Sequence, residues 1–225
     1  MALGKRYKEA LKAAEKTKIY GLKEAVQILK KMPQTKFNQT VDLCFHLNID
    51  PKKSDQLVRG TVTLPHGTGK AVRVAAFCKG EQEKEAKAAG ADFVGASELI
   101  DKVAGGFLDF DAAVATPDIM KDLSRVGKIL GPRGLMPSPK TGTVTNNVSQ
   151  AIKDIRGGKI EFKADKLAGI HVPVGKVNFS ESQILENASK VMEAVSHSRP
   201  ATVKGNFIKS VFISLTMSPG LRVAL

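Results

Sequence analysis

The sequence predicts two domains, a small parallel α/β domain inserted into an α+β domain that both ends of the chain build together. Strict alternation of apolar and polar residues, typical of strands with one solvent-exposed face, occurs near both ends of the chain. Between them, short apolar runs alternate with helical segments, which indicates a parallel sheet. Glycine-bearing segments at Pro65–Lys70 and Arg156–Lys159 separate the two patterns. We therefore expect one domain from residues 1–67 and 158–225 and the other from residues 68–157.

The amino-terminal part predicts two helices followed by two strands. Residues 5–16 are strong helix formers, and Leu22–Met32 predicts a second helix that Pro33 ends. The alternation from Val41 to Ile49 predicts a half-buried strand. After a polar loop, Leu57–Leu64 is expected to return as its antiparallel partner.

The middle part predicts buried strands between helices. The expected strands are Ala71–Phe77, Ala91–Gly95 and Asp111–Ala115. The expected helices are Glu81–Ala89, Ser97–Val103, Asp118–Leu130 and Asn146–Ile155. Pro117 suits the start of the third of these helices, because proline is tolerated in a first turn.

The carboxyl-terminal part returns to the first pattern. Strands are expected at Ile160–Phe162 and Ile170–Val174, around a loop at Asp165–Gly169, and a last strand at Phe207–Met217. Ser180 is a good N-cap for an amphipathic helix over Glu181–Ser196.

The charge of the chain predicts a polyanionic partner. Its 35 Lys and Arg against 22 Asp and Glu give +13 and a pI near 9.7, which favours nucleic acid or an anionic membrane surface. By the expected domains, residues 1–67 carry +7, residues 158–225 carry +4 and residues 68–157 only +2. The main polyanion surface should therefore belong to the split domain.

A shaped basic loop is expected at Gly127–Thr143, which holds four glycines, three prolines and three cations without a carboxylate. Glycine permits positive φ and proline fixes φ, so the loop should be rigid. Its cations Lys128, Arg133 and Lys140 are candidates for a secondary RNA contact.

Motifs for catalysis, cofactors and metals are incomplete. Leu64–Lys70 has the Gly-Lys of a phosphate-binding loop but lacks its first glycine, and Ala71 replaces the magnesium-binding hydroxyl, so a turn is expected. No Gly-x-Gly-x-x-Gly follows a predicted strand. The four histidines lack metal-ligand spacing. Gly131–Gly134 matches a Gly-x-x-Gly loop, but Pro137 prevents the helix that should follow. We expect no catalytic residue, metal or cofactor.

The cysteines and the amino terminus predict a cytoplasmic protein. Cys44 and Cys78 are isolated, which fits buried thiols in a reducing compartment. The amino terminus becomes polar before an apolar signal-peptide core can form, and no apolar run is long enough to span a bilayer.

Four motifs in the same order resemble the large-subunit ribosomal protein L-one family, in its bacterial form. They are Lys36–Asp42 (KFNQTVD), Gly127–Gly142 (GKILGPRGLMPSPKTG), Gly169–Lys176 (GIHVPVGK) and Thr216–Gly220 (TMSPG). The resemblance implies a split α+β domain with an antiparallel sheet and packed helices, interrupted by a Rossmann-like α/β domain. It also implies binding to large-subunit ribosomal RNA at the mobile side stalk, contact with deacylated tRNA in the exit site, and repression of the operon's own mRNA. A monomer is expected away from the ribosome, with no membrane partner.

The resemblance also assigns RNA-contacting residues. These are Lys36, Phe37, Thr40, Lys166, His171, Ser210, Thr216, Met217 and Ser218. Lysines can neutralise phosphates, hydroxyls can bind phosphate or 2′-OH groups, and Phe37 can pack on a ribose or base. From the residues alone, Phe37 fits a core aromatic, and Thr216 fits the solvent-exposed face of a strand equally well. Met217 falls on the buried side by alternation, so it is exposed only if the strand ends before it.

Two departures from the family pattern bear on these residues. Ser218 stands where the family has glycine, which would cost stability if φ there were positive. Lys163-Ala164 replaces Arg-Asn, which changes the chemistry of the following loop.

The glycines of the two crossings, Gly67, Gly69, Gly157 and Gly158, are candidate hinge residues. Ordinary surface turns within one domain explain the same glycines almost as well. Two other functions stay open, a nucleotide-binding enzyme that uses the α/β insert and a free translational repressor that binds mRNA.

Overall fold

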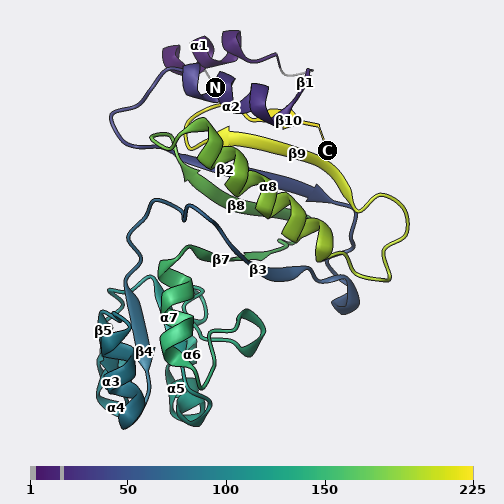
Figure 1. Ribbon diagram of the computed structural model, residues 1–225. Coiled ribbons are helices and arrows are strands. Elements are labelled where there is room, and N and C mark those ends of the chain that lie inside the picture. Colours follow the sequence, from purple (N-terminus) through teal and green to yellow (C-terminus); the bar gives the residue numbers. More distant parts are fainter. Residues whose placement is uncertain (1–3, 16–17, 225) are drawn as a thin grey trace. The chain divides into compact units, whose positions relative to one another are not determined.

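The computed structural model describes residues 4–15 and 18–224, and the chain divides into two compact units. Unit 1 comprises the chain up to Gly69 and from Ile160 onward, and unit 2 is Lys70–Lys159 (Figure 1). Each crossing lies two residues later than the boundary expected from the sequence. Sheets with packed helices occur in both units, so the predicted class, α/β together with α+β in two domains, is confirmed.

The core of unit 1 is a five-stranded sheet in the order β1-β10-β9-β2-β8. Its strands are β1 (Ile19–Tyr20), β2 (Thr40–Leu47), β8 (Gly169–Lys176), β9 (Ile208–Leu215) and β10 (Leu221–Val223). β2 pairs antiparallel with β8 on one side and β9 on the other. The centre of the sheet thus joins segments from both ends of the chain. β9 is not the last strand, since the short β10 follows it; β1 and β10 were not predicted.

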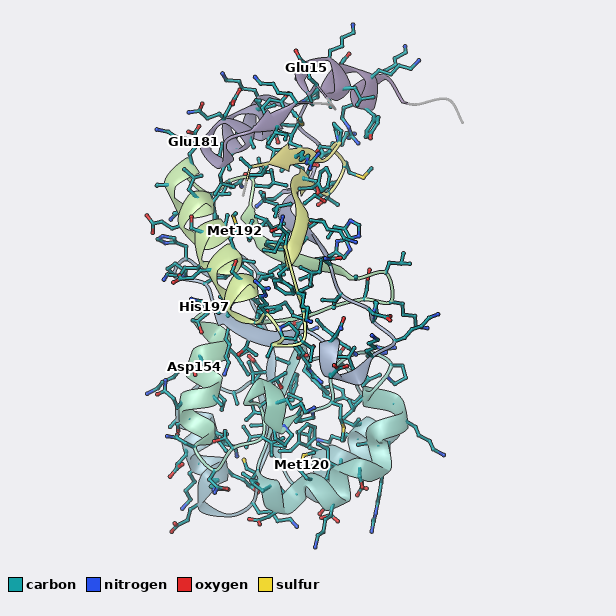
Figure 2. All side chains as sticks on the ribbon, turned by 90° about the vertical axis from the view of Figure 1, so that its right-hand side faces the viewer. Glu15, Met120, Asp154, Glu181, Met192 and His197 are labelled. Carbon is teal, nitrogen blue, oxygen red and sulfur yellow. The ribbon has the colours of Figure 1, made fainter. Side chains whose placement is uncertain are left out.

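Helices cover one face of this sheet. α2 (Leu22–Lys31) and α8 (Glu181–His197) contact each other and the strands, whereas α1 (Lys5–Ala13) precedes them; residue 16, the expected end of α1, lies outside the described residues. Figure 2 follows α8 along the sheet from Glu181 to His197. Alternate β2 residues are buried beneath the helices, as predicted. Ser180 caps α8 as expected, because its hydroxyl accepts from Gln183 N–H while the Gln183 side chain accepts from Ser180 N–H.

The predicted pairing of Leu57–Leu64 with the Val41–Ile49 strand is wrong. Both edges of β2 are occupied, by β8 and β9, so no edge is left for it. The segment instead follows a short 3₁₀ turn, Ser54–Gln56, and forms β3 (Arg59–Thr63), which pairs with β7 (Lys159–Lys163) in a separate two-stranded ribbon.

Unit 2 is a three-stranded parallel sheet, in the order β5-β4-β6, between two layers of helices. The strands are β4 (Val74–Phe77), β5 (Phe93–Gly95) and β6 (Ala112–Ala115). α4 (Ser97–Ala104) packs in one apolar cluster, and α3 (Glu81–Ala88) and α7 (Val148–Arg156) pack in another. All four β4 residues are buried, as expected of a central parallel strand.

The expected continuous helix over Asp118–Leu130 is wrong. The segment is a series of single turns, namely 3₁₀ Pro117–Ile119, α5 (Met120–Leu123), 3₁₀ Ser124–Val126 and α6 (Gly127–Leu130). Ser124 contributes to the break, because its hydroxyl donates to the Lys121 carbonyl at 2.6 Å and so favours the tighter turn. The strand expected from Ala71 starts later, at Val74.

Candidate nucleic-acid interface

The face of the unit 1 sheet opposite the helices carries polar and aromatic side chains, and we call it the open face. It includes Asp42, Cys44 and His46 of β2, His171 of β8, and Ser210, Phe212 and Ser214 of β9. Cross-strand pairing sets Cys44 beside His171 and Phe212, and His46 beside Ser210. Thr40 and His46 are six residues apart on one strand, or roughly 20 Å. The open face is therefore long enough to follow several nucleotides.

Thr40 and Thr216 meet at one end of the open face. Thr40 N–H donates to Thr216 Oγ1 at 3.0 Å, and Thr216 N–H donates to the Thr40 carbonyl at 3.1 Å. Lys176, which was not predicted as a site residue, donates from Nζ to Thr40 Oγ1 at 2.8 Å. Two hydroxyls and an ammonium group thus converge from three strand ends.

The two exposed apolar residues predicted for the site flank this end. Phe37 is 51% exposed and Met217 is 50% exposed. The interpretation of Phe37 as a core aromatic is therefore wrong. Met217 lies beyond the end of β9, which is Leu215, so the alternation of buried and exposed residues no longer applies to it. Lys36 beside Phe37 is exposed as well. Apolar contact surface and positive charge are both available to a ligand here.

Gln39 and Ser218 hold the turn that presents Met217. Gln39 is only 2% exposed, and its side-chain oxygen accepts from Met217 N–H at 3.1 Å. Ser218 Oγ accepts from Leu215 N–H at 2.9 Å and donates to the Pro219 carbonyl at 3.0 Å. Among the described non-glycine residues only Ala168 has a positive φ, so the φ of Ser218 is not positive. Serine in place of the family's glycine therefore causes no backbone strain at position 218.

The loop Asp165–Gly169 lies at the other end of the open face. Asp165 Oδ1 accepts from Gly169 N–H at 2.7 Å and from Leu167 N–H at 2.8 Å, and these bonds hold the pKa of the carboxyl below its ordinary value. Lys166 is exposed in this loop. His171 is 66% exposed, with Nε2 at 3.9 Å from Asp165 Oδ2. Lys166 thus lies at the opposite end from Thr40, whereas His171 lies between this loop and the middle of the sheet, where it pairs with Cys44.

The middle of the open face is less basic than its ends. His171 Nδ1 lies 3.2 Å from Cys44 Sγ, and burial raises the pKa of the Cys44 thiol. Burial also raises the pKa of the Asp42 carboxyl, against the opposing charges of Lys176 and His171. The thiol is therefore not activated, which favours a structural part for Cys44.

The predicted secondary contact residues belong to unit 2. Lys128, Arg133 and Lys140 are all exposed. The loop that carries the last of them is fixed by Ser138, whose N–H donates to Thr143 Oγ1 at 2.8 Å and whose carbonyl accepts from Thr141 Oγ1 at 3.0 Å. Gly134 and Gly142 have φ of 70° and 65°, so the shaped loop depends on glycine as expected.

The crossing glycines have mixed conformations. Gly67, Gly69 and Gly158 have positive φ, while Gly157 has a helical φ of −69° at the end of α7. The buried side chain of Asn187 donates to the Gly67 carbonyl at 3.0 Å and to the Val174 carbonyl at 2.8 Å. Gly67 is therefore anchored to unit 1, and the hinge assignment stays a prediction.

Within the described residues, no group of three or more His, Cys, Asp or Glu side chains is arranged to hold a metal ion. None of the helices in the described part of the chain is long and apolar enough to cross a membrane.

The sequence matches one protein family over most of its length. The family model described as "Ribosomal protein L1p/L10e family" matches residues 29–219. The chain belongs to this family. Large ribosomal subunit protein uL1 of Acidothermus cellulolyticus is 52% identical over 223 residues, which cover 99% of this chain and 93% of that protein. Large ribosomal subunit protein uL1 of Thermosipho melanesiensis is 54% identical over 220 residues, which cover 97% of this chain and 95% of that protein.

Membership in the L1p/L10e family confirms the resemblance drawn from the four motifs, in its bacterial form. It also agrees with the expectation of a protein that is not an enzyme. Sequence reasoning did not select Gln39 and Lys176, although both lie within the motifs that identify the family. A glutamine beside a strand and a lysine at a strand end carry no signal of their own; only the fold brings them to Met217 and Thr40.

Proposed function

We propose that this chain is a constituent of the large ribosomal subunit and binds large-subunit ribosomal RNA through the open face of unit 1. The relatives' names support the first part. The second part depends chiefly on the junction where Thr40 meets Thr216, a residue 176 positions away in the sequence. Two hydroxyl groups, the Lys176 ammonium group and two exposed apolar side chains lie together there. RNA backbones are bound by such hydroxyls and lysines, and unstacked bases by such apolar surfaces.

The distribution of charge supports unit 1 as the RNA-binding unit. Residues 1–67 and 158–225 together carry +11 of the net +13. Lysine and arginine that neutralise phosphates release counterions, so the binding constant should fall with salt. Unit 2, nearly neutral apart from its basic loop, is proposed to make the secondary contact through Lys128, Arg133 and Lys140.

The finer roles follow from the family resemblance. We infer that the chain lies at the mobile side stalk of the cytoplasmic ribosome, contacts deacylated tRNA in the exit site, and represses translation of its own operon mRNA. Glycines 67, 69, 157 and 158 are proposed as the hinge between the units.

Titration of the protein with large-subunit ribosomal RNA over a range of salt concentrations tests the RNA-binding role. The logarithm of the binding constant should fall with log[salt], with a slope of about −0.9 per phosphate neutralised on a duplex and a smaller slope on single strands. A flat response would contradict the proposal. Absence from purified large subunits would favour a free mRNA repressor, and saturable mononucleotide binding at micromolar concentration would favour an enzyme.

A further inference from the structure

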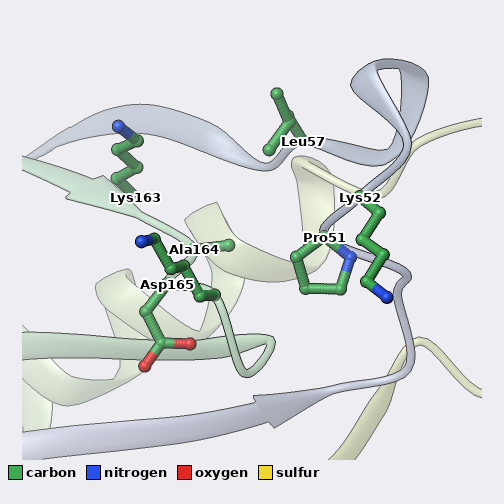
Figure 3. A pocket seen from close by; sticks show the side chains of 7 residues that line it. Pro51, Lys52, Leu57, Lys163, Ala164 and Asp165 are labelled. Carbon is green, nitrogen blue, oxygen red and sulfur yellow. The ribbon is translucent and has the colours of Figure 1, made fainter.

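A shallow pocket of about 630 Å³ lies in unit 1, between the loop before β3 and the chain that leaves β7. Figure 3 shows Pro51, Lys52 and Leu57 on one side and Lys163, Ala164 and Asp165 on the other. Lys166 completes the lining. The hydrogen bond from Ala164 N–H to the Val58 carbonyl, at 2.9 Å, ties the two sides together. A backbone hydrogen bond therefore joins the two segments that form the pocket.

The lining has an apolar part and a cationic part. Pro51, Leu57 and Ala164 supply apolar surface, and Leu57 is 53% exposed. Lys52, Lys163 and Lys166 supply three ammonium groups against the single carboxylate of Asp165. Two backbone N–H groups already engage that carboxylate. The pocket thus offers positive charge around an apolar surface that has no partner within the described part of unit 1.

We propose that this pocket receives one unpaired nucleotide of the RNA bound by the open face. The base would lie on Leu57, Pro51 and Ala164, and the lysines would neutralise its flanking phosphates. A paired base cannot enter, because its faces are stacked within the helix, whereas an unpaired base can be extruded onto protein. The volume is in the range of pockets that enclose a small organic molecule. This inference rests on the proposed function, because the pocket shares Asp165 and Lys166 with the far end of the open face.

The residue at position 164 bears on what the pocket can recognise. An asparagine at position 164 would offer an amide for hydrogen bonds to a base edge, whereas alanine offers only a methyl group. Contact with the flat face of a base tolerates any sequence, because every base has such a face. The pocket should therefore select an unpaired nucleotide over a paired one with little regard to base identity.

The test uses the full chain and two RNA hairpins of the same sequence, one fully paired and one with a single extra unpaired nucleotide in the stem. The wild type should bind the bulged hairpin about tenfold more tightly, because the unpaired base buries apolar surface against the pocket. Leu57→Ser should reduce this ratio to near one and leave binding of the paired hairpin unchanged. Since Leu57 is half exposed, the variant should fold, which its thermal melt checks. Ile19→Ser, at an equal 53% exposure, is the matched control and should keep the ratio.

The lysines are tested by the double variant Lys163→Ala, Lys166→Ala. It should weaken binding of the bulged hairpin more than binding of the paired one. Lys23→Ala, Lys31→Ala on α2 removes the same charge and should weaken both equally. Equal binding of the two hairpins by the wild type would overturn the proposal that the pocket receives a nucleotide. An unchanged ratio of bulged to paired hairpin affinity in Leu57→Ser would overturn it as well. Failure to bind ribosomal RNA at all would instead overturn the proposed function.

Discussion

Thr216 shows how far the proposed RNA surface depends on single hydroxyl groups. Its Oγ1 accepts the Thr40 N–H that begins β2, so the same group orders the strand end and faces the ligand. Thr216→Val keeps the shape but leaves this N–H without its acceptor, at a cost of about 1 kcal/mol in the free energy of unfolding. We expect RNA affinity to fall about tenfold, measured by fluorescence anisotropy.

Thr63→Val, at an exposed position in β3, is the control for Thr216→Val and should leave RNA affinity unchanged. Unchanged affinity in Thr216→Val would remove this end of the open face from the site.

The half-buried carboxyl group of Asp42 should make the stability of the folded protein depend on pH. Burial raises the pKa of its carboxyl above the ordinary 3.8, so the folded protein holds this proton more tightly than the unfolded chain. The group therefore lowers the free energy of unfolding as the pH rises through the folded-state pKa. Asp42→Asn should be more stable than the wild type at pH 7, by at most about 1 kcal/mol. Thermal melts should show the difference shrinking as the pH falls toward 3.8; a constant difference would contradict this cause.

The sequence indicated the chemistry of the site better than its geometry. Lys36, Phe37, Thr216 and Met217 were selected as candidates through family motifs, and their RNA contacts stay a prediction. Alternation correctly linked the exposure of Met217 to where β9 ends. Contacts between residues distant in the chain, such as Gln39 with Met217, follow from strand register. A side chain's polarity does not reveal which backbone N–H will lie opposite it, so these residues could not be chosen beforehand.

At the scale of elements, period-two alternation predicted β2 and β9 because each has one buried and one open face. Alternation of apolar and polar residues predicts which face of a strand is buried, but not which strand lies beside it. The partner predicted for β3 was therefore wrong. β1 and β10 have two and three residues, too few for any periodicity to be visible. Helical propensity likewise could not show that Ser124 and its neighbours break the helix after Pro117 into separate turns.

The first crossing offers an element-scale test through two glycines of similar conformation. Gly67 and Gly69 have φ of 63° and 70°, but a Cβ at Gly69 would lie 2.9 Å from the Phe179 ring, whereas one at Gly67 would meet nothing within 4 Å. Gly67→Ala should cost about 1 to 2 kcal/mol from backbone strain alone. Gly69→Ala should cost about 1 to 3 kcal/mol more because of overpacking.

Chemical denaturation measures the free energy of unfolding of the wild type and of both glycine variants, and each variant serves as the other's control. Equal losses in the two would show that Phe179 moves aside freely.

At the scale of the whole molecule, each unit has apolar clusters of its own. The unit 1 cluster includes residues from both chain ends, and the two unit 2 clusters contain only residues of the insert. Residues 1–69 joined directly to 160–225 should therefore fold and bind ribosomal RNA within about threefold of the full chain, since most of the charge remains. Electrophoretic mobility shifts would measure this.

The isolated insert, residues 70–159, is the control for the protein with joined ends and should bind the same RNA far more weakly. Loss of binding in the joined ends, with binding retained by the insert, would move the main RNA surface to unit 2.

The central position of β2 has a consequence for biosynthesis. β2 ends at Leu47, yet its first partner begins only at Gly169, and its second at Ile208. At typical elongation rates of about 5 to 20 residues per second, the nascent strand waits roughly 6 to 24 seconds with both edges unpaired, while the insert can already finish folding. Unpaired edges invite pairing with other chains. Slow translation or scarce chaperones should therefore make this protein aggregate through its amino-terminal segment before its synthesis is complete.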